Sequence, residues 1–146
     1  MNADNFFNSE ERNEIVAAIE KAELNTSGEI RVHVENHCKD DALDRAVQVF
    51  SMLKMHKTRL RNGVLVYLAI KDQRFAIIGD AGINAKVSDD FWDKTKSIML
   101  KEFKSGEFCN GLVKGIGSAG EQLHDFFPYQ SDDINELSDD ISFGNN

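Results

Sequence analysis

The chain has 146 residues, enough for one domain with a sizeable core and too few to divide comfortably into two. With 41% hydrophobic residues, 29% charged residues and 10 Phe, the composition is that of a globular protein, not a disordered one. The net charge of −8 argues against nucleic acid as a partner, because an acidic surface repels a phosphate backbone.

The N-terminal segment MNADNFFNSEER has neither a basic leader nor an apolar stretch. No window approaches the roughly 20 apolar residues that are needed to span a bilayer. We therefore expect a cytoplasmic protein without direct membrane insertion, and a monomer. Cys38 and Cys109 are expected to be free thiols, because two distant cysteines do not form a secreted-type disulfide framework.

The first half of the chain predicts a helix, a strand and a second helix. Asn8 and Glu11 have the spacing of a capping box and begin the first helix, which ends in residues 25–28. Polar and apolar residues alternate over residues 29–35, which indicates a half-exposed strand near a sheet edge. Apolar residues at helical spacing then predict a helix over residues 41–57.

The second half predicts a hairpin followed by two helices. Residues 64–70 are an unbroken apolar run, typical of a central strand that is covered on both faces. A short polar connection leads to a strand at residues 75–78, so the two strands should pair antiparallel. Ser88 with two aspartates after it predicts a helix start, Gly106 ends that helix, and a last helix covers about residues 107–124.

This order of elements contains one parallel crossover and one hairpin, which predicts a mixed sheet with helices on both faces. The expected fold class is α/β, a three-layer α/β/α sandwich formed by residues 1–128. Residues 129–146 contain only acidic charges and few apolar residues, so we expect a disordered acidic tail.

A candidate site lies where one strand ends and a helix begins. Ca²⁺ and Mg²⁺ take oxygen ligands, and Asp80, Asp89, Asp90 and Asn62 could together provide them. The alternative is that Asp89 and Asp90 only cap a helix and that Asp80 is a turn residue. The spacing does not match the calcium loop of an EF-hand, so both interpretations stay open.

Other kinds of site have less support. His33, His37 and Cys38 are close in sequence, but their spacing matches no standard zinc pattern. No phosphate-binding glycine loop is present, and the serines lack the context of a catalytic nucleophile. Arg74 and Arg61 could attract an anion or pair with the carboxylates, or could simply be solvated.

Four segments resemble the TPM domain family in the same order and at compatible spacing, from about Phe6 to Pro128. They are TSGEIRV, RNGVLVYLA, RFAIIGDAGI and GEFCNGLVKGI. The resemblance implies an α/β/α sandwich, and calcium binding and acid phosphatase activity have been attributed to some members. It makes Asp80, Asp89 and Asn62 the positions of interest. The commoner family pattern has an acidic residue before Asn-Gly, where this chain has Arg61.

Three functions follow as hypotheses. The first is a TPM domain that binds a divalent cation, Ca²⁺ or Mg²⁺, weakly between Asp80 and Asp89 and acts in protein interaction, stress or repair. The alternative is a metal-assisted acid phosphatase, in which an aspartate activates water and Arg74 steadies the phosphate. The third is a protein-binding module whose acidic tail docks on a basic partner.

Overall fold

The computed structural model describes residues 3–130 and 135–144. In chain order its elements are η1 (Ala3–Asn5), α1 (Ser9–Ala22), β1 (Glu29–Glu35), α2 (Ala42–Met52), η2 (Met55–Lys57), β2 (Gly63–Ala69), β3 (Arg74–Gly79), α3 (Ala81–Asn84), α4 (Asp93–Lys104), α5 (Phe108–His124) and β4 (Ser142–Phe143).

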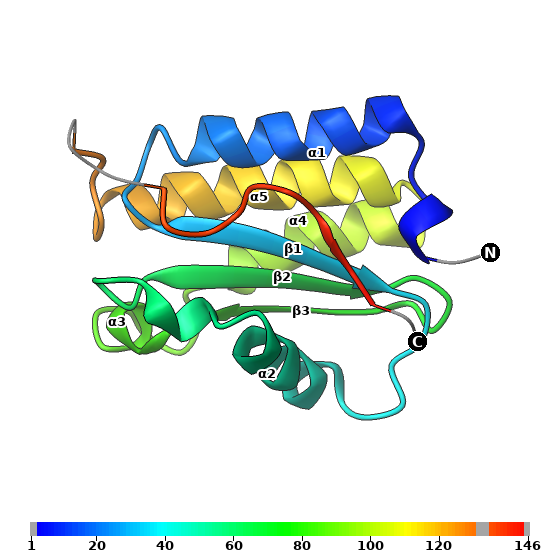
Figure 1. The fold of residues 1–146 in the computed structure, drawn as a ribbon, viewed down its shortest axis with the longest axis horizontal. Helices are drawn as coiled ribbons and strands as arrows, with labels where there is room; N and C mark the ends of the chain where they lie inside the picture. The colour runs from blue at the N-terminus through cyan, green and yellow to red at the C-terminus, as the bar shows by residue number, and fades with distance from the viewer. Residues whose placement is uncertain (1–2, 131–134, 145–146) are drawn as a thin grey trace.

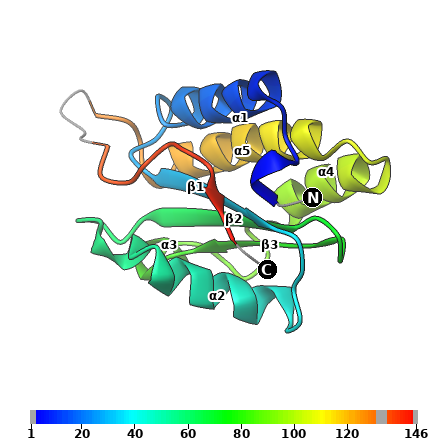
Figure 2. The same cartoon turned by 45° about the vertical axis from the view of Figure 1, so that its right-hand side comes forward.

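The sheet has the strand order β3-β2-β1-β4. β1 pairs parallel with β2 and with β4, and β2 pairs antiparallel with β3. Helices α1, α4 and α5 cover one face and α2 lies on the other (Figure 1). The short α3 follows the end of β3, and its Ile83 packs on the core beneath α4 and α5. Figure 2 shows the same three layers after a 45° turn. The three-layer α/β/α sandwich with a mixed sheet is therefore confirmed.

Local sequence explains most of these elements. The Asn8 side chain accepts from the N–H of Glu11, whose carboxylate in turn accepts from Asn8, so the capping box forms as expected. Every residue of β2 is buried, because one core fills the space below it and another the space above. The hairpin from β2 to β3 is also confirmed.

Three predicted elements differ in the structure. β1 is buried along its length apart from Arg31, which is half-buried, because β4 and the chain that leads to it lie beside the strand. The helix expected over residues 41–57 stops at Met52, and Lys54 then adopts a positive φ of 55° that no α-helix allows. The helix expected at Ser88 begins only at Asp93, after a turn.

The C-terminal segment (residues 135–144), red in Figure 1, runs alongside β1 and parallel to it. In this segment Ile141 and Phe143 pack on one core and Leu137 on the other, while the disorder expected for residues 129–146 stays a prediction. His33 pairs with Ser142 in β4. Three apolar side chains and a strand edge thus connect this acidic segment to the domain. Residues 131–134 and 145–146 of the expected tail lie outside the described residues.

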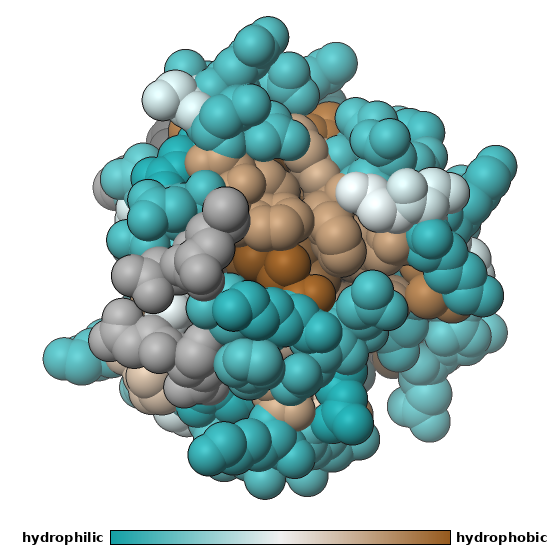
Figure 3. All heavy atoms as spheres, turned by 90° about the vertical axis from the view of Figure 1, so that its right-hand side faces the viewer, coloured by the Kyte–Doolittle hydropathy of each residue, from teal (hydrophilic) through white to brown (hydrophobic). Residues whose placement is uncertain are grey.

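One end of the molecule, near both termini, is apolar. Figure 3 looks onto this end and shows apolar side chains gathered at its centre inside a hydrophilic rim. Phenylalanine rings contact one another in this domain, with centroids 5.5 Å apart for Phe6 and Phe108 and 5.1 Å apart for Phe75 and Phe103. These half-buried rings close the core between the sheet and α5.

Candidate functional site

Asp80 follows β3 directly and is the N-cap of α3. The residue is only 7% exposed, and its carboxylate accepts a hydrogen bond from the N–H of Ala81 over 2.7 Å. A carboxylate this buried needs a positive partner, because an unpaired charge is costly to desolvate. Arg61 provides it, with Nε 2.7 Å from Oδ2 and Nη2 2.9 Å from Oδ1. The carboxylate at the centre of the expected cation site is therefore already paired with a cation of the chain itself.

The backbone holds Arg61 in this position. Arg61 has a φ of 51°, a left-handed conformation that side chains with a Cβ rarely adopt. Its carbonyl accepts the N–H of Gly82 over 2.8 Å, and a Cβ at Gly82 would overlap the carbonyl oxygen of Leu60. Only glycine lets α3 approach the loop so closely. The Arg61 side chain nevertheless stays 50% exposed, so solvent reaches this ion pair.

The other expected ligands do not gather around Asp80 as a preformed cage. Asp89 and Asp90 are exposed, and Asp90 Oδ1 accepts from the Ser88 hydroxyl over 2.5 Å. Asn62 is buried and donates from Nδ2 to the carbonyl of Ser27. Within residues 3–130 and 135–144, no three His, Cys, Asp or Glu side chains are grouped so that they could hold a metal ion. Cation binding by these residues stays a prediction.

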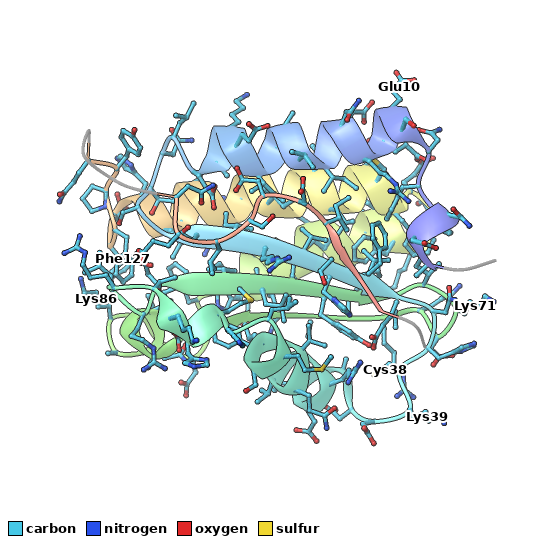
Figure 4. All side chains as sticks on the ribbon, viewed as in Figure 1. Glu10, Cys38, Lys39, Lys71, Lys86 and Phe127 are labelled. Carbon is cyan, nitrogen blue, oxygen red and sulfur yellow. The ribbon has the colours of Figure 1, made fainter. Side chains whose placement is uncertain are left out.

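Arg74 lies at the far end of β3 from Asp80. It begins the strand, where Nη1 donates to the carbonyl oxygens of Cys38 over 3.3 Å and Asp40 over 2.9 Å. Figure 4 marks Cys38 on the loop before α2. A strand of six residues spans about 20 Å, so a phosphate held at Asp80 would be out of reach of Arg74. The structure does not bring these two candidates together.

Glu29, which the sequence analysis did not single out, anchors the C-terminal segment. It begins β1 and is 4% exposed. Its Oε1 accepts from the backbone N–H of Glu136 over 2.5 Å and of Leu137 over 2.7 Å. Its Oε2 is buried and has no hydrogen-bond partner. One carboxyl group thus has one satisfied and one unsatisfied oxygen.

Two further carboxyl groups lie beside Glu29. Glu23, the C-cap of α1, accepts from the N–H of Ile30 over 2.9 Å and also shares a hydrogen bond with Asp139. Asp139 Oδ1 is a second buried oxygen without a partner. These three side chains, with Glu20, Thr26 and Ser27, line a cavity of about 270 Å³ that we call the carboxyl pocket.

Burial changes the acidity of this group. Burial raises the pKa of Glu23 to about 9, and the hydrogen bond with Asp139 adds to the shift. Burial also raises the pKa of Glu29 to about 7, although the two backbone N–H groups that it accepts oppose the shift. The pocket therefore holds protons at pH values at which ordinary glutamates are ionised.

The carboxyl pocket and the Asp80 region are connected through one loop. Residues 58–62 carry Arg61, and the N–H of Arg59 donates to the Glu136 carboxylate over 3.1 Å. Asn62 accepts the N–H of Glu29 at its carbonyl over 3.2 Å. A change in this loop would therefore reach the C-terminal segment through two hydrogen bonds.

At the other end of β1, Glu35 is fully buried in a network of its own. Arg45 donates to both of its oxygens, over 2.8 and 2.9 Å, and the Tyr67 hydroxyl donates over 2.5 Å. His33 Nε2 lies 3.1 Å from Oε1. Burial favours the neutral acid, but the hydrogen bonds from Arg45, His33 and Tyr67 outweigh it and hold the pKa of Glu35 well below its usual range.

Comparisons with known proteins agree with this architecture. A family model described as the TPM domain matches residues 1–122. The chain belongs to the TPM domain family. No curated protein matches it. None of the helices formed by residues 3–130 and 135–144 has the length and apolar character that crossing a membrane requires.

Solved structures similar to this TPM domain include the NMR structure of the BA42 protein from the psychrophilic bacterium Bizionia argentinensis. It is 53% identical with a TM-score of 0.91, over 96% of this chain and 97% of that one. The N-terminal domain of a P. gingivalis protein is 14% identical with a TM-score of 0.70, over 86% and 83% of the two chains. The N-terminal domain of cg2496 from Corynebacterium glutamicum is 13% identical with a TM-score of 0.64, over 93% and 80%. The last two share the fold alone.

Proposed function

We propose that this TPM domain is a protein-interaction domain whose C-terminal segment responds to a divalent cation at Asp80. The observation that carries the proposal is the ion pair of Asp80, a buried carboxylate whose cationic partner Arg61 is half exposed. The guanidinium of Arg61 stands where a bound cation would be attracted to Asp80. Because its side chain reaches solvent, it can leave the carboxylate without being buried elsewhere.

The available donors fit weak binding. Asp80 would hold Ca²⁺ or Mg²⁺ through its carboxylate, with Asn62, Asp89 and Asp90 as the other candidate oxygen donors. One buried carboxylate with solvent-exposed companions gives low affinity, and Arg61 competes for it. Release of Arg61 would loosen the loop of residues 58–62, which also binds the Glu136 carboxylate through Arg59. A partner would then meet a more accessible edge of β1.

The test is a titration of metal-stripped protein with Ca²⁺ and then Mg²⁺, followed by backbone amide NMR shifts. We expect saturable shifts in residues 61–63 and 79–82 that are lost in Asp80→Asn. Arg61→Asp removes the competing cation and adds a carboxylate, so its affinity should rise at least about tenfold. Asp44→Asn, an exposed aspartate in the first turn of α2, is the matched control. Unchanged shifts in Asp80→Asn, or no localised shifts in the unmutated protein, would leave a metal-free interaction module.

Phosphomonoester hydrolysis remains the alternative prediction, and no contact in the described residues favours it. Arg74, the residue expected to steady the phosphate, bonds to backbone carbonyls about a strand length from Asp80. Turnover of p-nitrophenyl phosphate with Ca²⁺ or Mg²⁺, from pH 5 to pH 8, is the direct assay. Turnover at background level would remove this alternative, and turnover abolished by Asp80→Asn would revive it.

A further inference from the structure

The carboxyl pocket contains buried acceptors that no donor of the described chain satisfies. Glu29 Oε2 and Asp139 Oδ1 are both buried and unpaired, and both residues line the cavity. Native proteins rarely leave such oxygens without a partner, because each one costs about 1 to 3 kcal/mol when it is desolvated and unpaired. Two of them in one cavity of about 270 Å³ indicate a missing donor.

The missing donor should be positively charged. Glu20, Glu23, Glu29 and Asp139 line the cavity, and none of its described lining residues is Lys, Arg or His. A compact metal ion is a poor match, since no three acidic, His or Cys side chains among the described residues are grouped to hold one. A group with several N–H donors spread over its surface suits separated acceptor oxygens better.

The rim of the pocket indicates the rest of such a ligand. Leu24 and Tyr129 line the cavity, and their side chains are 66% and 43% exposed. An apolar and aromatic rim above an acidic floor is complementary to a side chain with a methylene stem and a charged tip. Lysine and arginine side chains have this form, and so do free alkylamines.

We propose that the carboxyl pocket binds the ammonium or guanidinium tip of a basic side chain from a partner protein, or of a free alkylamine with the same chemistry. The tip would donate to the carboxyl groups of Glu29 and Asp139, with its stem between Leu24 and Tyr129. This site is separate from Asp80 and does not depend on a divalent cation there.

Binding should release protons and become tighter as the pH rises. Glu29 has a pKa raised to about 7, and Glu23 one raised to about 9, so the empty pocket is partly protonated near neutral pH. The charged or titratable groups that face Glu29 are Glu20 of α1, Glu23 at the C-cap of α1, and Tyr129, Glu136 and Asp139 from the chain after α5. A cation favours the ionised form of each carboxyl, so affinity should increase between pH 6 and pH 8.

The experiment titrates the full chain with butylguanidinium chloride and butylammonium chloride, followed by amide NMR shifts at pH 7.5. We expect saturable shifts in residues 26–29 and 136–139. The affinity derived from them should be at least about fivefold lower at pH 6. Tetramethylammonium chloride, which has no N–H donor, and potassium chloride at equal ionic strength should not reproduce them. Equal shifts with these two salts would show only charge screening and would overturn the proposal.

Glu29→Gln is the deciding variant, because its amide oxygen can still accept from Glu136 and Leu137 while the charge is lost. Its affinity for butylguanidinium should fall at least about fivefold, and Asp139→Asn is a second variant with the same expectation. Glu10→Gln is the matched control. Figure 4 shows Glu10 on the opposite side of the molecule from Phe127, at the start of α1, whereas the carboxyl pocket lies beyond the end of that helix. Undiminished binding in both pocket variants would overturn the proposal.

A second arm separates the two sources of the cation. The capped tripeptide acetyl-Gly-Arg-Gly-amide is titrated beside butylguanidinium. Tighter binding of the peptide supports a side chain of a partner protein, because the backbone then adds contacts. Equal or weaker binding of the peptide supports a free alkylamine. Binding of neither probe contradicts the proposal, whatever the outcome of the cation titration at Asp80.

Discussion

The two ends of β1 each bury a glutamate, and the two glutamates have opposite properties. Glu35 meets Arg45, His33 and Tyr67, and its pKa is held below the usual range. Glu29 meets two backbone N–H groups and other acids, and burial raises its pKa to about 7. Burial alone therefore does not decide the charge of a carboxyl group; the nearest cation does.

The two ends of β1 also differ in role: the network of Glu35 stabilises the fold, and the pocket of Glu29 is the proposed binding site. The Glu35 network is complete and joins β1, β2 and α2, so it stabilises the fold. The carboxyl pocket around Glu29 is incomplete, which is a feature of binding sites more than of cores. Asp80 is intermediate, because its cationic partner Arg61 is present but half exposed. Three variants test the contrast between Glu35 and Glu29.

The largest effect is expected for Glu35→Gln. The substitution leaves the Arg45 guanidinium, only 18% exposed, without its counter-charge, and such losses cost about 3 to 5 kcal/mol of unfolding free energy. Glu35 has a lowered pKa in the folded state, so its stabilisation is present above the unfolded value of about 4.3 and is lost as the pH falls. Urea unfolding at pH 7 and pH 3.5 measures it, and the deficit should shrink at pH 3.5.

An equal loss in the control Glu10→Gln would contradict this assignment, since Glu10 is exposed. A Glu35→Gln protein that is as stable as the unmutated chain at pH 7 would mean that Arg45 finds water instead. In that case Glu35 would not depend on Arg45, and the contrast between the two ends of β1 would be lost.

The second largest effect is expected for Glu29→Gln, which should raise stability where Glu35→Gln lowers it. Glu29 has a folded pKa of about 7 against an unfolded value of about 4.3, so between these values the folded state binds more protons. Its presence therefore makes stability fall as the pH rises from about 5 to 8. Removing the charge should flatten that decline and stabilise the protein at pH 8 by about 1 to 3 kcal/mol.

Urea unfolding at pH 5, 6, 7 and 8 checks this second prediction, with Glu10→Gln again as the control. The control should follow the pH dependence of the unmutated chain. If the unfolding free energy of Glu29→Gln declines as steeply as that of the control between pH 5 and 8, Glu29 is ionised in the folded state. The contrast with Glu35 then disappears. Glu23, with its pKa raised to about 9, should cause a further decline over the same pH range in both proteins, so Glu29→Gln removes only the share of Glu29.

The fold could be predicted wherever its signals are local. The unbroken apolar run at Val64 predicted the buried β2, and the capping box at Asn8 predicted the start of α1. The helix start predicted at Ser88 was wrong, because a serine followed by acidic residues also suits a turn. Here that turn precedes Asp93. A sequence pattern reports the local preference of a segment, and the same pattern at Ser88 suits a turn or a helix start. The start of α4 at Asp93 was therefore not predicted.

Only part of the candidate site could be predicted from the sequence. Asp80 stood out because it follows a strand, but its pairing with Arg61 depends on a left-handed loop and on the close approach of Gly82. Glu29 fell in an alternating strand and was interpreted as solvent-facing. Its partner Glu136 lies 107 residues further along the chain, in a segment whose composition predicts disorder. A contact at such separation leaves no periodic signal in one sequence.

The smallest effect is expected for Tyr67→Phe, which removes one donor from the Glu35 network and keeps the ring in place. Tyr67 is fully buried and its hydroxyl bonds to Glu35 Oε2, so the loss should be about 1 to 2 kcal/mol, less than for Glu35→Gln because Arg45 remains. Tyr129→Phe, on the exposed rim of the carboxyl pocket, is the matched control and should change stability by less than about 0.5 kcal/mol. Urea unfolding at pH 7 measures both variants. A loss in Tyr67→Phe as large as that of Glu35→Gln would mean that the hydroxyl, and not Arg45, keeps this end of β1 ionised.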